Sequence, residues 1–493
     1  MGLIIIAVTL IGRPSYAQSR DKNTWPNFRG INCSGIAAPE QDPPVNFGAI
    51  QNVIWKVSLP EGHSSPCIWG DNIFITGFKE ERKQLLMFCL NRKDGAIKWE
   101  KNISVKEFEQ ANQLNNPATA TPATDGESIY YYFSAYGILC YDYNGKLKWE
   151  LTTSIPKSHH GMGTSPVVVG NLVLLNFLGH WDDPRVLAIN KYNGDIVWKY
   201  SLPKKDDYYV DSYATPVIYK DQVIIYTSED ITSYNIKTGE LVWRFITGVP
   251  DAASTPVLGK DILFTAGHST FGNPDMIAQL PGFTEFTGKY DVNRDLKIDT
   301  VECKDFTFLM YPEKPEVSPK VSMSDAFWFW DKNSDSYIDS TEWRIMEDYL
   351  KSFSVKEGIK AIRLGGKGDI SLTNFVWGNP EQASHVSSPL YYNNHVYMIR
   401  DGGIISCFDA QNGKVIYRGK TGATGAYFSS PVAAGGKIYI ASRNGIVTVI
   451  DTGEKFNIIA QNNLGDNITA TPAVVDNKLY LRTSKFLYAF GKK

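Results

Sequence analysis

The sequence lacks several features that would point to common functions. Beyond residue 17, no part of the 493-residue chain approaches a run of about eighteen apolar residues, so no membrane span is expected once a leader is removed. The formal net charge is only -2, and no stripe of Lys and Arg is dense enough to neutralise phosphates, which excludes a nucleic-acid partner. There is no Gly-x-Ser-x-Gly nucleophile motif and no phosphate-binding loop.

The first 17 residues resemble a secretory signal peptide. Residues 2–12 form a short apolar run, and Ser15-Tyr16-Ala17 is a small-x-small cleavage site in front of Gln18. The usual positively charged start is missing, which leaves open a longer leader or a weak anchor. No cysteine directly follows the apolar run, so a lipid anchor is not expected. The sequence therefore predicts export, to the periplasm or the cell surface.

One sequence unit, which opens with Ser or Thr followed by Pro, recurs eight times. The eight dipeptides are Ser65-Pro66, Thr121-Pro122, Ser165-Pro166, Thr215-Pro216, Thr255-Pro256, Ser388-Pro389, Ser430-Pro431 and Thr471-Pro472. Each is followed by two short apolar stretches, then by a third stretch such as Ala188-Ile189-Asn190. A Gly-containing turn, here Asn193-Gly194, leads to a fourth stretch with an aromatic residue, here Trp198. Four short antiparallel strands per unit are typical of a β-propeller blade.

The ends of the chain indicate how the propeller closes. The last unit stops after its third strand, whereas the strand expected at residues 52–59 has no Ser/Thr-Pro in front of it. We therefore expect this N-terminal strand to complete the C-terminal blade, which removes an open sheet edge. The predicted fold is all-β, an eight-bladed β-propeller of four-stranded blades with a small α-helical insertion, and seven blades if one unit is degenerate.

Three of the six cysteines, Cys89, Cys140 and Cys407, occupy one column of the repeat, which other copies fill with Ala, Ser or Val. That column requires a small buried residue, so these cysteines are expected to be structural thiols. Spacing leaves open whether Cys33, Cys67 and Cys303 form disulfides.

The repeat resembles that of the quinoprotein-type (PQQ-binding-like) propeller family, whose non-catalytic members include the propeller subunit of the outer-membrane protein assembly machine. Residues 25–30, Trp-Pro-Asn-Phe-Arg-Gly, are similar to the opening segment of exported propellers in that superfamily. The dehydrogenases of the family typically carry two adjacent cysteines near the quinone. No two cysteines are adjacent here and no Cys-x-x-Cys-His haem motif occurs, so bound PQQ is not expected.

The interval between Pro256 and Pro389 is far longer than the others and holds two twelve-residue acidic loops. Both match the EF-hand pattern, in which positions 1, 3, 5, 7, 9 and 12 supply the oxygen ligands of calcium. The residues at these positions are Asp291, Asn293, Asp295, Lys297, Asp299 and Glu302 in the first loop, and Asp331, Asn333, Asp335, Tyr337, Asp339 and Glu342 in the second. Lys297 and Tyr337 would contribute their carbonyl oxygens. The sequence thus predicts two Ca²⁺ sites.

The segments around the loops support a pair of EF-hands. Ile298 and Ile338 hold position 8, where paired loops make a short strand contact, and aromatic residues at helical spacing precede each loop. Position 6 is Leu296 in the first loop and Ser336 in the second, where the family has Gly. A non-Gly residue at positive φ costs roughly 1 kcal/mol, so both sites should be weak. The insertion is expected between the second and third strands of its blade.

A second candidate site lies on the face formed by the loops before the Ser/Thr-Pro dipeptides, where histidines and other polar residues concentrate. Its residues are His63, His160, Asp211, Tyr213, His385 and Tyr427. They could line a funnel that binds a ligand or a metal, or they could be ordinary polar loop residues that do not converge.

These observations divide the chain into five parts. They are a signal peptide (1–17), an N-terminal segment leading into the propeller (18–50), the first part of the propeller (51–267), the EF-hand pair (268–358) and the second part of the propeller (359–493). The expected function is an exported, non-catalytic scaffold that binds a protein or glycan partner, and the resemblance implies a role in cell-envelope protein assembly. The alternative is a PQQ-type dehydrogenase that uses the funnel.

Overall fold

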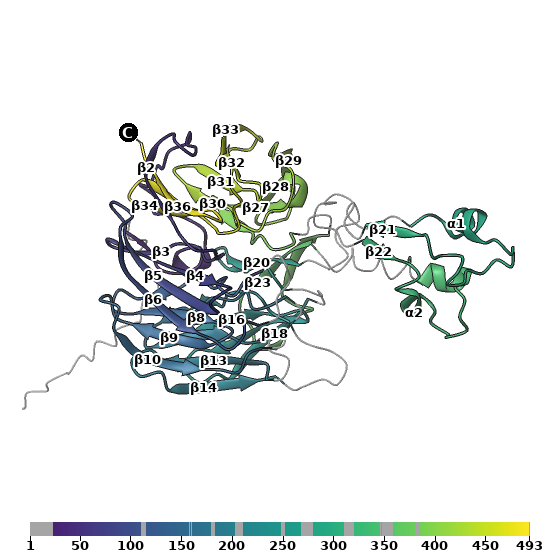
Figure 1. Ribbon diagram of the computed structural model, residues 1–493, viewed down its shortest axis with the longest axis horizontal. Coiled ribbons are helices and arrows are strands. Elements are labelled where there is room, and N and C mark those ends of the chain that lie inside the picture. Colours follow the sequence, from purple (N-terminus) through teal and green to yellow (C-terminus); the bar gives the residue numbers. More distant parts are fainter. Residues whose placement is uncertain are drawn as a thin grey trace, which may run out of the picture.

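The computed structural model describes residues 23–109, 115–156, 158, 160–178, 183–202, 211–247, 252–267, 280–309, 320–345, 347, 358–380 and 384–492. Most of them form eight four-stranded antiparallel sheets in a ring, which confirms the predicted eight-bladed β-propeller (Figure 1). The signal peptide predicted for residues 1–17 lies outside the described residues.

The first four blades follow one another along the chain without interruption. Blade 1 consists of β3 (Cys67–Trp69), β4 (Asn72–Lys79), β5 (Gln84–Asn91) and β6 (Ile97–Ser104). Blade 2 consists of β7 (Ala123–Thr124), β8 (Ile129–Phe133), β9 (Gly137–Tyr141) and β10 (Leu147–Thr152). Blade 3 consists of β11 (Val167–Val169), β12 (Leu172–Asn176), β13 (Arg185–Asn190) and β14 (Ile196–Ser201). Blade 4 consists of β15 (Val217–Tyr219), β16 (Gln222–Tyr226), β17 (Asp230–Asn235) and β18 (Leu241–Ile246).

The remaining blades contain the insertion and the closure of the ring. Blade 5 consists of β19 (Val257–Leu258), β20 (Ile262–Gly267), β23 (Gly358–Arg363) and β25 (Phe375–Asn379). Blade 6 consists of β26 (Leu390–Tyr392), β27 (His395–Arg400), β28 (Ile404–Asp409) and β29 (Val415–Lys420), with η2 (Asp401–Gly403) between β27 and β28. Blade 7 consists of β30 (Val432–Ala434), β31 (Lys437–Ala441), β32 (Ile446–Asp451) and β33 (Ile458–Asn463). Blade 8 consists of β34 (Ala473–Val475), β35 (Lys478–Arg482), β36 (Phe486–Phe490) and β2 (Val53–Ser58).

The N-terminal strand completes the last blade, as the sequence predicts. β2 pairs antiparallel with β36, with Val53 opposite Phe490 and Ser58 opposite Phe486. The two ends of the propeller sequence are therefore joined by backbone hydrogen bonds, and the ring has no unpaired edge at its closure.

The first strand of each blade lies next to the channel, because first strands of neighbouring blades contact one another, as β3 does with β7 and β34. The Ser/Thr-Pro dipeptides open these strands. In every one of them the Ser or Thr backbone N–H donates to the hydroxyl oxygen of the Ser or Thr in the next blade, at 2.9 to 3.2 Å. The eighth bond, from Thr471 to Ser65, closes the circle. We call these eight residues the hydroxyl ring, and it explains why the repeat requires Ser or Thr.

Neighbouring blades also join through the tryptophan of the fourth strand. The Trp55 indole N–H donates to the carbonyl oxygen of Arg92 at 3.0 Å, and the ring lies against Gly95 of the next blade. A Cβ on Gly95 would lie 2.6 Å from the indole, and its φ is +76°, so only glycine fits. Four further indoles donate in the same way: Trp99 to Tyr143, Trp149 to Lys191, Trp198 to Ile236 and Trp377 to Ala410.

The junction between blades 4 and 5 differs from this pattern. β24 (Gly368–Asp369), in the loop between β23 and β25, pairs parallel with β18, with Gly368 opposite Trp243. Trp243 is fully buried and donates to the side-chain oxygen of Gln222 at 2.9 Å. β24 thus adds a fifth strand to blade 4, beside the tryptophan of its fourth strand.

The insertion follows β20 and returns at β23, between the second and third strands of blade 5, as predicted. Its described part contains α1 (Phe283–Tyr290), α2 (Phe327–Trp330), a helical stretch at 340–345, and the hairpin of β21 (Thr307–Leu309) and β22 (Lys320–Ser322). Figure 1 shows these elements as a lobe beside the ring. The lobe has its own core: Phe286, Ile298, Cys303, Met323, Phe327, Trp330, Ile338 and Trp343.

All six cysteines are buried free thiols, so the expectation for the repeat column is met and the other three also remain unpaired. Within the described ranges, no helix is both long and apolar enough to cross a bilayer.

Candidate functional sites in the channel and the inserted lobe

The N-terminal segment runs inside the propeller channel. β1 (Thr24–Trp25) pairs with the free edge of β3, with Trp25 opposite Ile68. Pro26 O then accepts a hydrogen bond from the Thr124 backbone N–H of blade 2 at 2.8 Å. Both contacts are made with first strands, which line the channel. We call residues 23–44 the plug.

The plug continues across the channel to four more blades. The Asn32 side chain pairs with the backbone of Ile218 in blade 4, accepting from its N–H and donating to its carbonyl oxygen, both at 2.8 Å. Ile36 makes a parallel bridge to Ala433 in blade 7. The guanidinium of Arg29 donates to Pro389 O beside blade 6, and the Asn477 N–H of blade 8 donates to the Gln41 side chain. The plug is thus fixed to six of the eight blades.

The tip of the plug is an unusually bent stretch of backbone. Arg29, Asn32 and Cys33 have φ of 58°, 50° and 55°, in the left-handed region that non-glycine residues rarely adopt, and Asn32 and Cys33 lie in η1 (Ile31–Cys33). Gly30 and Gly35 also have positive φ. Such strain persists only where surrounding contacts fix the conformation. Here they hold Arg29 and Cys33 at the level of the Ser/Thr-Pro dipeptides.

Arg29 and Cys33 are both fully buried at this level. The Cys33 thiol is directed at Pro216 O, at 3.9 Å, and burial raises its pKa to about 12. Burial lowers the pKa of Arg29 to about 10, so the guanidinium is still protonated at neutral pH. The plug therefore brings a positive charge into the centre of the ring.

The six predicted funnel residues lie in or next to the loops that precede the Ser/Thr-Pro dipeptides. They fall into three groups around the ring. In the first, the rings of His160 and Tyr213 are 5.8 Å apart, from the loops before blades 3 and 4. Asp211, two residues before Tyr213, is buried, and its backbone N–H donates to Ser228 Oγ at 3.2 Å.

The second group combines His385 and Tyr427 through Asp401, a residue that sequence reasoning missed. His385 Nδ1 lies 3.8 Å from a carboxylate oxygen of the buried Asp401, whose other oxygen accepts the Tyr427 backbone N–H at 2.5 Å. The Tyr427 hydroxyl donates to Ala423 O at 2.7 Å and is buried, and burial raises its pKa to about 12. Tyr427 therefore acts as a packed structural residue rather than a group exposed in a funnel.

The third group is His63 with Arg482 and Arg443. Burial, together with these two positively charged neighbours, lowers the pKa of His63 to about 3, so His63 is neutral at physiological pH. Arg482 is buried, yet its guanidinium donates to Ser64 Oγ at 2.9 Å, Thr76 O at 2.7 Å and Pro60 O at 2.9 Å. Sequence reasoning missed both arginines, because nothing in the repeat pattern marks the end of a second strand as functional.

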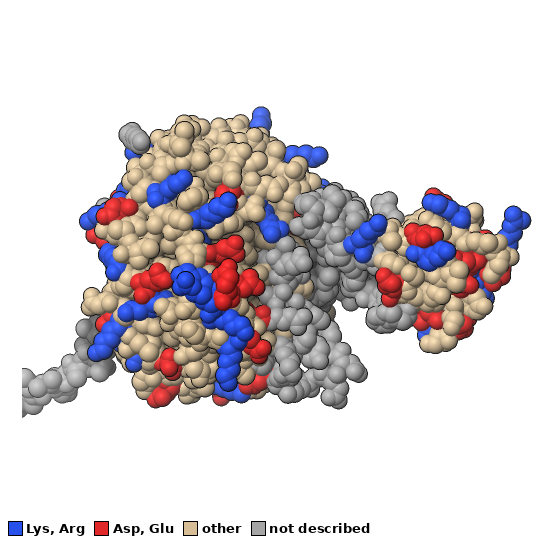
Figure 2. All heavy atoms as spheres, viewed as in Figure 1, with Lys and Arg blue, Asp and Glu red and all other residues tan. Residues whose placement is uncertain are grey.

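Charges of both signs are interspersed over the face of the propeller shown in Figure 2, without a continuous basic area. This distribution agrees with the absence of a basic stripe in the sequence.

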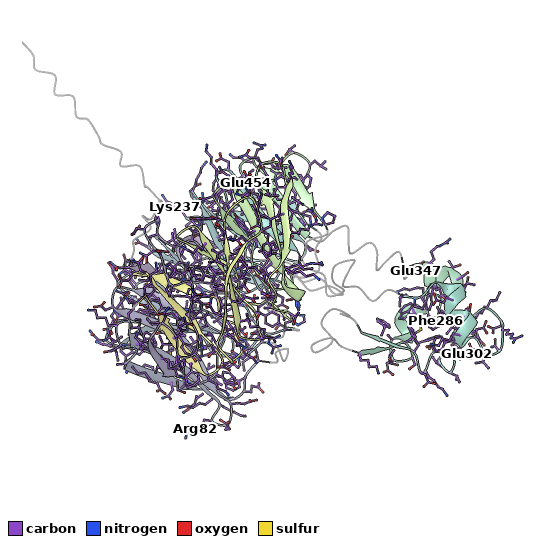
Figure 3. All side chains as sticks on the ribbon, turned by 90° about the horizontal axis from the view of Figure 1, so that it is seen from above. Arg82, Lys237, Phe286, Glu302, Glu347 and Glu454 are labelled. Atoms are coloured by element: carbon purple, nitrogen blue, oxygen red, sulfur yellow. The ribbon has the colours of Figure 1, made fainter. Side chains whose placement is uncertain are left out.

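In the lobe, the first acidic loop is folded around its carboxylates. The Glu302 carboxylate accepts the backbone N–H groups of Val292 and Asn293, at 2.9 and 3.3 Å, and that of Asp299 at 3.2 Å. Asp291 accepts the N–H of Leu296 at 2.9 Å. Figure 3 shows Glu302 in its loop, and Phe286 between the strands and helices of the lobe.

The second loop repeats this arrangement residue for residue. Glu342 accepts from Lys332, Asn333 and Asp339, and Asp331 accepts from Ser336 at 2.9 Å. Leu296 and Ser336 have φ of 60° and 71°, the positive values that position 6 requires. The two loops contact each other through Ile298 and Ile338, whose backbones exchange hydrogen bonds of 3.0 and 2.8 Å, as predicted.

The loops differ in how far their ligand atoms converge. In the second loop, carboxylate oxygens of Asp331, Asp335 and Glu342 lie within 4.8 Å of one another, close enough to share one cation. Lys297 of the first loop lies 3.7 Å from the Asp335 carboxylate. The remaining predicted residues, Asn293, Asp295, Asp299, Asn333, Tyr337 and Asp339, lie at their expected loop positions.

The ring closure and the tryptophan junctions define an eight-bladed β-propeller built from one repeated unit. The family described as outer membrane protein assembly factor BamB matches residues 49–269 and 369–490, and the match stops on either side of the insertion. The chain belongs to this family. Among curated proteins, no sequence matches the chain.

Solved structures agree with this fold. BamB from Moraxella catarrhalis has a TM-score of 0.52 and 11% identity, over 89% of this chain and 99% of that one. A europium-containing methanol dehydrogenase has a TM-score of 0.56 and 12% identity, over 96% and 99% of the two chains. Quinohemoprotein alcohol dehydrogenase from Comamonas testosteroni has a TM-score of 0.58 and 10% identity, over 97% and 82%. At such identities the likeness shows the fold alone.

Proposed function

We propose that the chain is an exported, non-catalytic scaffold of the cell envelope that binds a protein or glycan partner and carries calcium in its inserted lobe. Membership of a family described as an outer membrane assembly factor supports the envelope role. The observation that carries the calcium proposal is the convergence of Asp331, Asp335 and Glu342 in a loop of EF-hand pattern. A rigid ring suits partner binding, because preorganised loops lose little entropy on association.

Calcium fits the second loop on chemical grounds. Hard carboxylate oxygens are its preferred ligands, and three of them already lie close together at positions 1, 5 and 12. The backbone N–H groups of Lys332, Asn333 and Asp339 orient the Glu342 carboxylate within the second loop. In the first loop Glu302 is held in the same way. We therefore propose calcium at both loops, with the second the stronger site.

A quinone-dependent dehydrogenase is the second candidate, favoured by the fold likeness to two dehydrogenases. The funnel residues fit a quinone poorly. The Tyr427 hydroxyl is engaged within the protein, and the sequence contains no adjacent cysteines. We therefore assign no catalytic role to the funnel residues.

Native mass spectrometry of residues 18–493, exported and purified without chelator, separates the two candidates. We expect two calcium increments and no organic adduct. A stoichiometric bound quinone would overturn the non-catalytic proposal, whereas a chain that binds no calcium from a millimolar solution would overturn the calcium proposal.

Calorimetry on two matched variants then locates the stronger site. Glu342→Gln removes a ligand charge at position 12 and should weaken calcium binding at the second loop by at least tenfold. Glu285→Gln makes the same chemical change at an exposed position of α1, in the same lobe but outside both loops, and should leave the affinity unchanged. Equal affinities for all three proteins would refute the assignment of Glu342 as a ligand.

A further inference from the structure

The two acidic loops are connected by the side chain of Lys297, which belongs to position 7 of the first loop and reaches the second. Its Nζ lies 3.7 Å from Asp335 Oδ2. The same Nζ lies 5.1 Å from the centre of the Tyr337 ring, whose face attracts cations. The bridge between Ile298 and Ile338, at the next position of each loop, holds the loops close enough for both contacts. A positive charge of the first loop therefore lies beside a carboxylate of the second.

The Asp335 oxygen that faces this ammonium is the one that remains for a cation. Its other oxygen, Oδ1, accepts the backbone N–H of Tyr337 at 3.0 Å, whereas Oδ2 accepts no hydrogen bond within the described residues. Asp335 is also one of the three residues whose carboxylate oxygens converge within 4.8 Å in the second loop. The ammonium of Lys297 and a cation in this loop would thus use the same negative charge.

The first loop has no such contact. Its equivalent oxygen, Asp295 Oδ2, accepts from the neutral side-chain amide of Asn293 at 3.1 Å. Position 7 of the second loop is Tyr337, which carries no charge to return to the first loop. Among the described residues, the carboxylates of Asp291, Asp295 and Glu302 make no ion pair with a lysine or arginine. The charge contact between the loops therefore runs in one direction only.

The size of the effect follows from the exposure of the pair. The side chains of Lys297 and Asp335 each remain 42% exposed, so solvent screens their attraction. Exposed ion pairs of this kind change an equilibrium constant by about two- to fivefold. A divalent cation brought near the ammonium is repelled by it, which acts in the same direction. Lys297 is therefore able to tune a binding site but not to abolish it.

We propose that Lys297 is an internal competitor for the second cation and holds the calcium affinity of the second loop below the value that its carboxylates alone would give. This inference rests on the calcium function proposed above. In the calcium-free lobe the ammonium offsets part of the repulsion among the carboxylates of the second loop. When calcium binds, that interaction is lost or turns into repulsion. Removal of the ammonium should therefore tighten calcium binding and also loosen the calcium-free loop.

The test is a calorimetric calcium titration of the full chain in a Glu302→Gln background, which weakens the first loop so that the second is measured by itself. Lys297→Met removes the ammonium and leaves the backbone carbonyl oxygen of residue 297 in place. At low ionic strength we expect the Kd of the second loop to fall by about two- to fivefold, and added salt should reduce the difference. Lys297→Arg retains the charge and should keep the Kd of the background.

Lys289→Met is the matched control for the loss of one positive charge. Lys289 lies on α1 of the same lobe, with its Nζ 5.0 Å from the centre of the Tyr290 ring, and it makes no ion pair within the described residues. Its Kd should equal that of the background. In the presence of chelator, hydrogen exchange in the second loop should be faster in Lys297→Met than in Lys297→Arg, because only the arginine still offsets the repulsion.

The outcomes separate this inference from the calcium function on which it rests. Calcium bound with equal Kd by Lys297→Met and Lys289→Met would overturn the competition and leave the calcium function standing. Weaker binding by Lys297→Met would also overturn it, because the lysine would then support the site. If the Glu302→Gln background bound no calcium from a millimolar solution, the second calcium site itself would be refuted, and the competition with it.

Discussion

The propeller and the inserted lobe are stabilised in opposite ways. The propeller repeats one small interaction eight times: each bond of the hydroxyl ring is modest, but together they close a circle. The lobe has one hydrophobic cluster and two acidic loops, and in the second loop three carboxylates converge within 4.8 Å. Carboxylates this close repel one another, and the calcium that we propose would offset that repulsion. The ring is stabilised by many equivalent contacts, whereas under the calcium proposal the lobe is stabilised by one ligand species.

The largest effect is expected where the ring closes. Trp55→Ala removes the indole of β2 that donates to Arg92 O and packs on Gly95. Loss of a buried tryptophan costs about 3–5 kcal/mol of unfolding free energy. Urea unfolding should show the whole propeller transition shifted, because β2 joins the first and last units. Calcium affinity should stay unchanged, since no contact of the lobe is lost. A weakened calcium affinity would contradict the independence of the two regions.

The converse experiment is to remove calcium. A ligand at about 100 times its Kd stabilises the state that binds it by about 2.7 kcal/mol, so chelation should destabilise the lobe by a similar amount. Hydrogen exchange measured by peptide should rise in α1 and α2 and remain low in the blades. The Glu285→Gln variant, treated with the same chelator, serves as control and should show the same hydrogen exchange as the chelated wild type. Unchanged exchange in the lobe would show that its core is stable without the cation.

Much of the ring follows from the sequence because its contacts repeat. The Ser/Thr of each dipeptide recurs at the same position, as do the Gly of most turns and the Trp in six of the eight fourth strands, so the alignment of units alone predicts blades and their closure. The acidic loops are equally recognisable, since their ligands lie within twelve residues. Even the positive φ of Leu296 and Ser336 follows from their loop position.

The plug could not be predicted in this way. Arg29 contacts a carbonyl oxygen 360 residues away, and Asn32 pairs with a strand 186 residues away, so no local spacing announces either contact. The same limitation applies to the predicted funnel residues. Sequence placed six polar residues on one face, but whether they converge depends on side chains from neighbouring loops. Asp401 is one such side chain, and its contact with the Tyr427 backbone became visible only in the fold.

Removal of a single bond of the hydroxyl ring should lower the stability less than either of the first two changes. Thr215→Val keeps the shape of the side chain but removes the oxygen that accepts the Ser165 backbone N–H at 3.2 Å. Leaving that buried N–H without an acceptor costs about 1–3 kcal/mol. Thr215→Ser retains the hydroxyl and should be close to wild type in urea unfolding. If Thr215→Val were as stable as Thr215→Ser, the ring would not be a source of stability.

The smallest expected effect is a change in how the stability of the propeller, rather than that of the lobe, depends on pH. The pKa of His63 is about 3 in the folded chain, against about 6.5 for an unfolded histidine. Between pH 3 and pH 6.5 the unfolded chain binds one more proton than the folded chain. The contribution of His63 to the free energy of unfolding is therefore complete above pH 6.5 and is lost as the pH falls toward 3. The slope is about 1.4 kcal/mol per pH unit, which gives about 1 kcal/mol between pH 7 and 5.5 after the gradual onset near 6.5. Burial lowers the pKa of the neighbouring Arg482 to about 9, so its guanidinium stays protonated throughout this range. Urea unfolding of His63→Asn at both pH values should show a propeller transition less sensitive to pH by that amount, and an unchanged sensitivity would mean that another group is responsible.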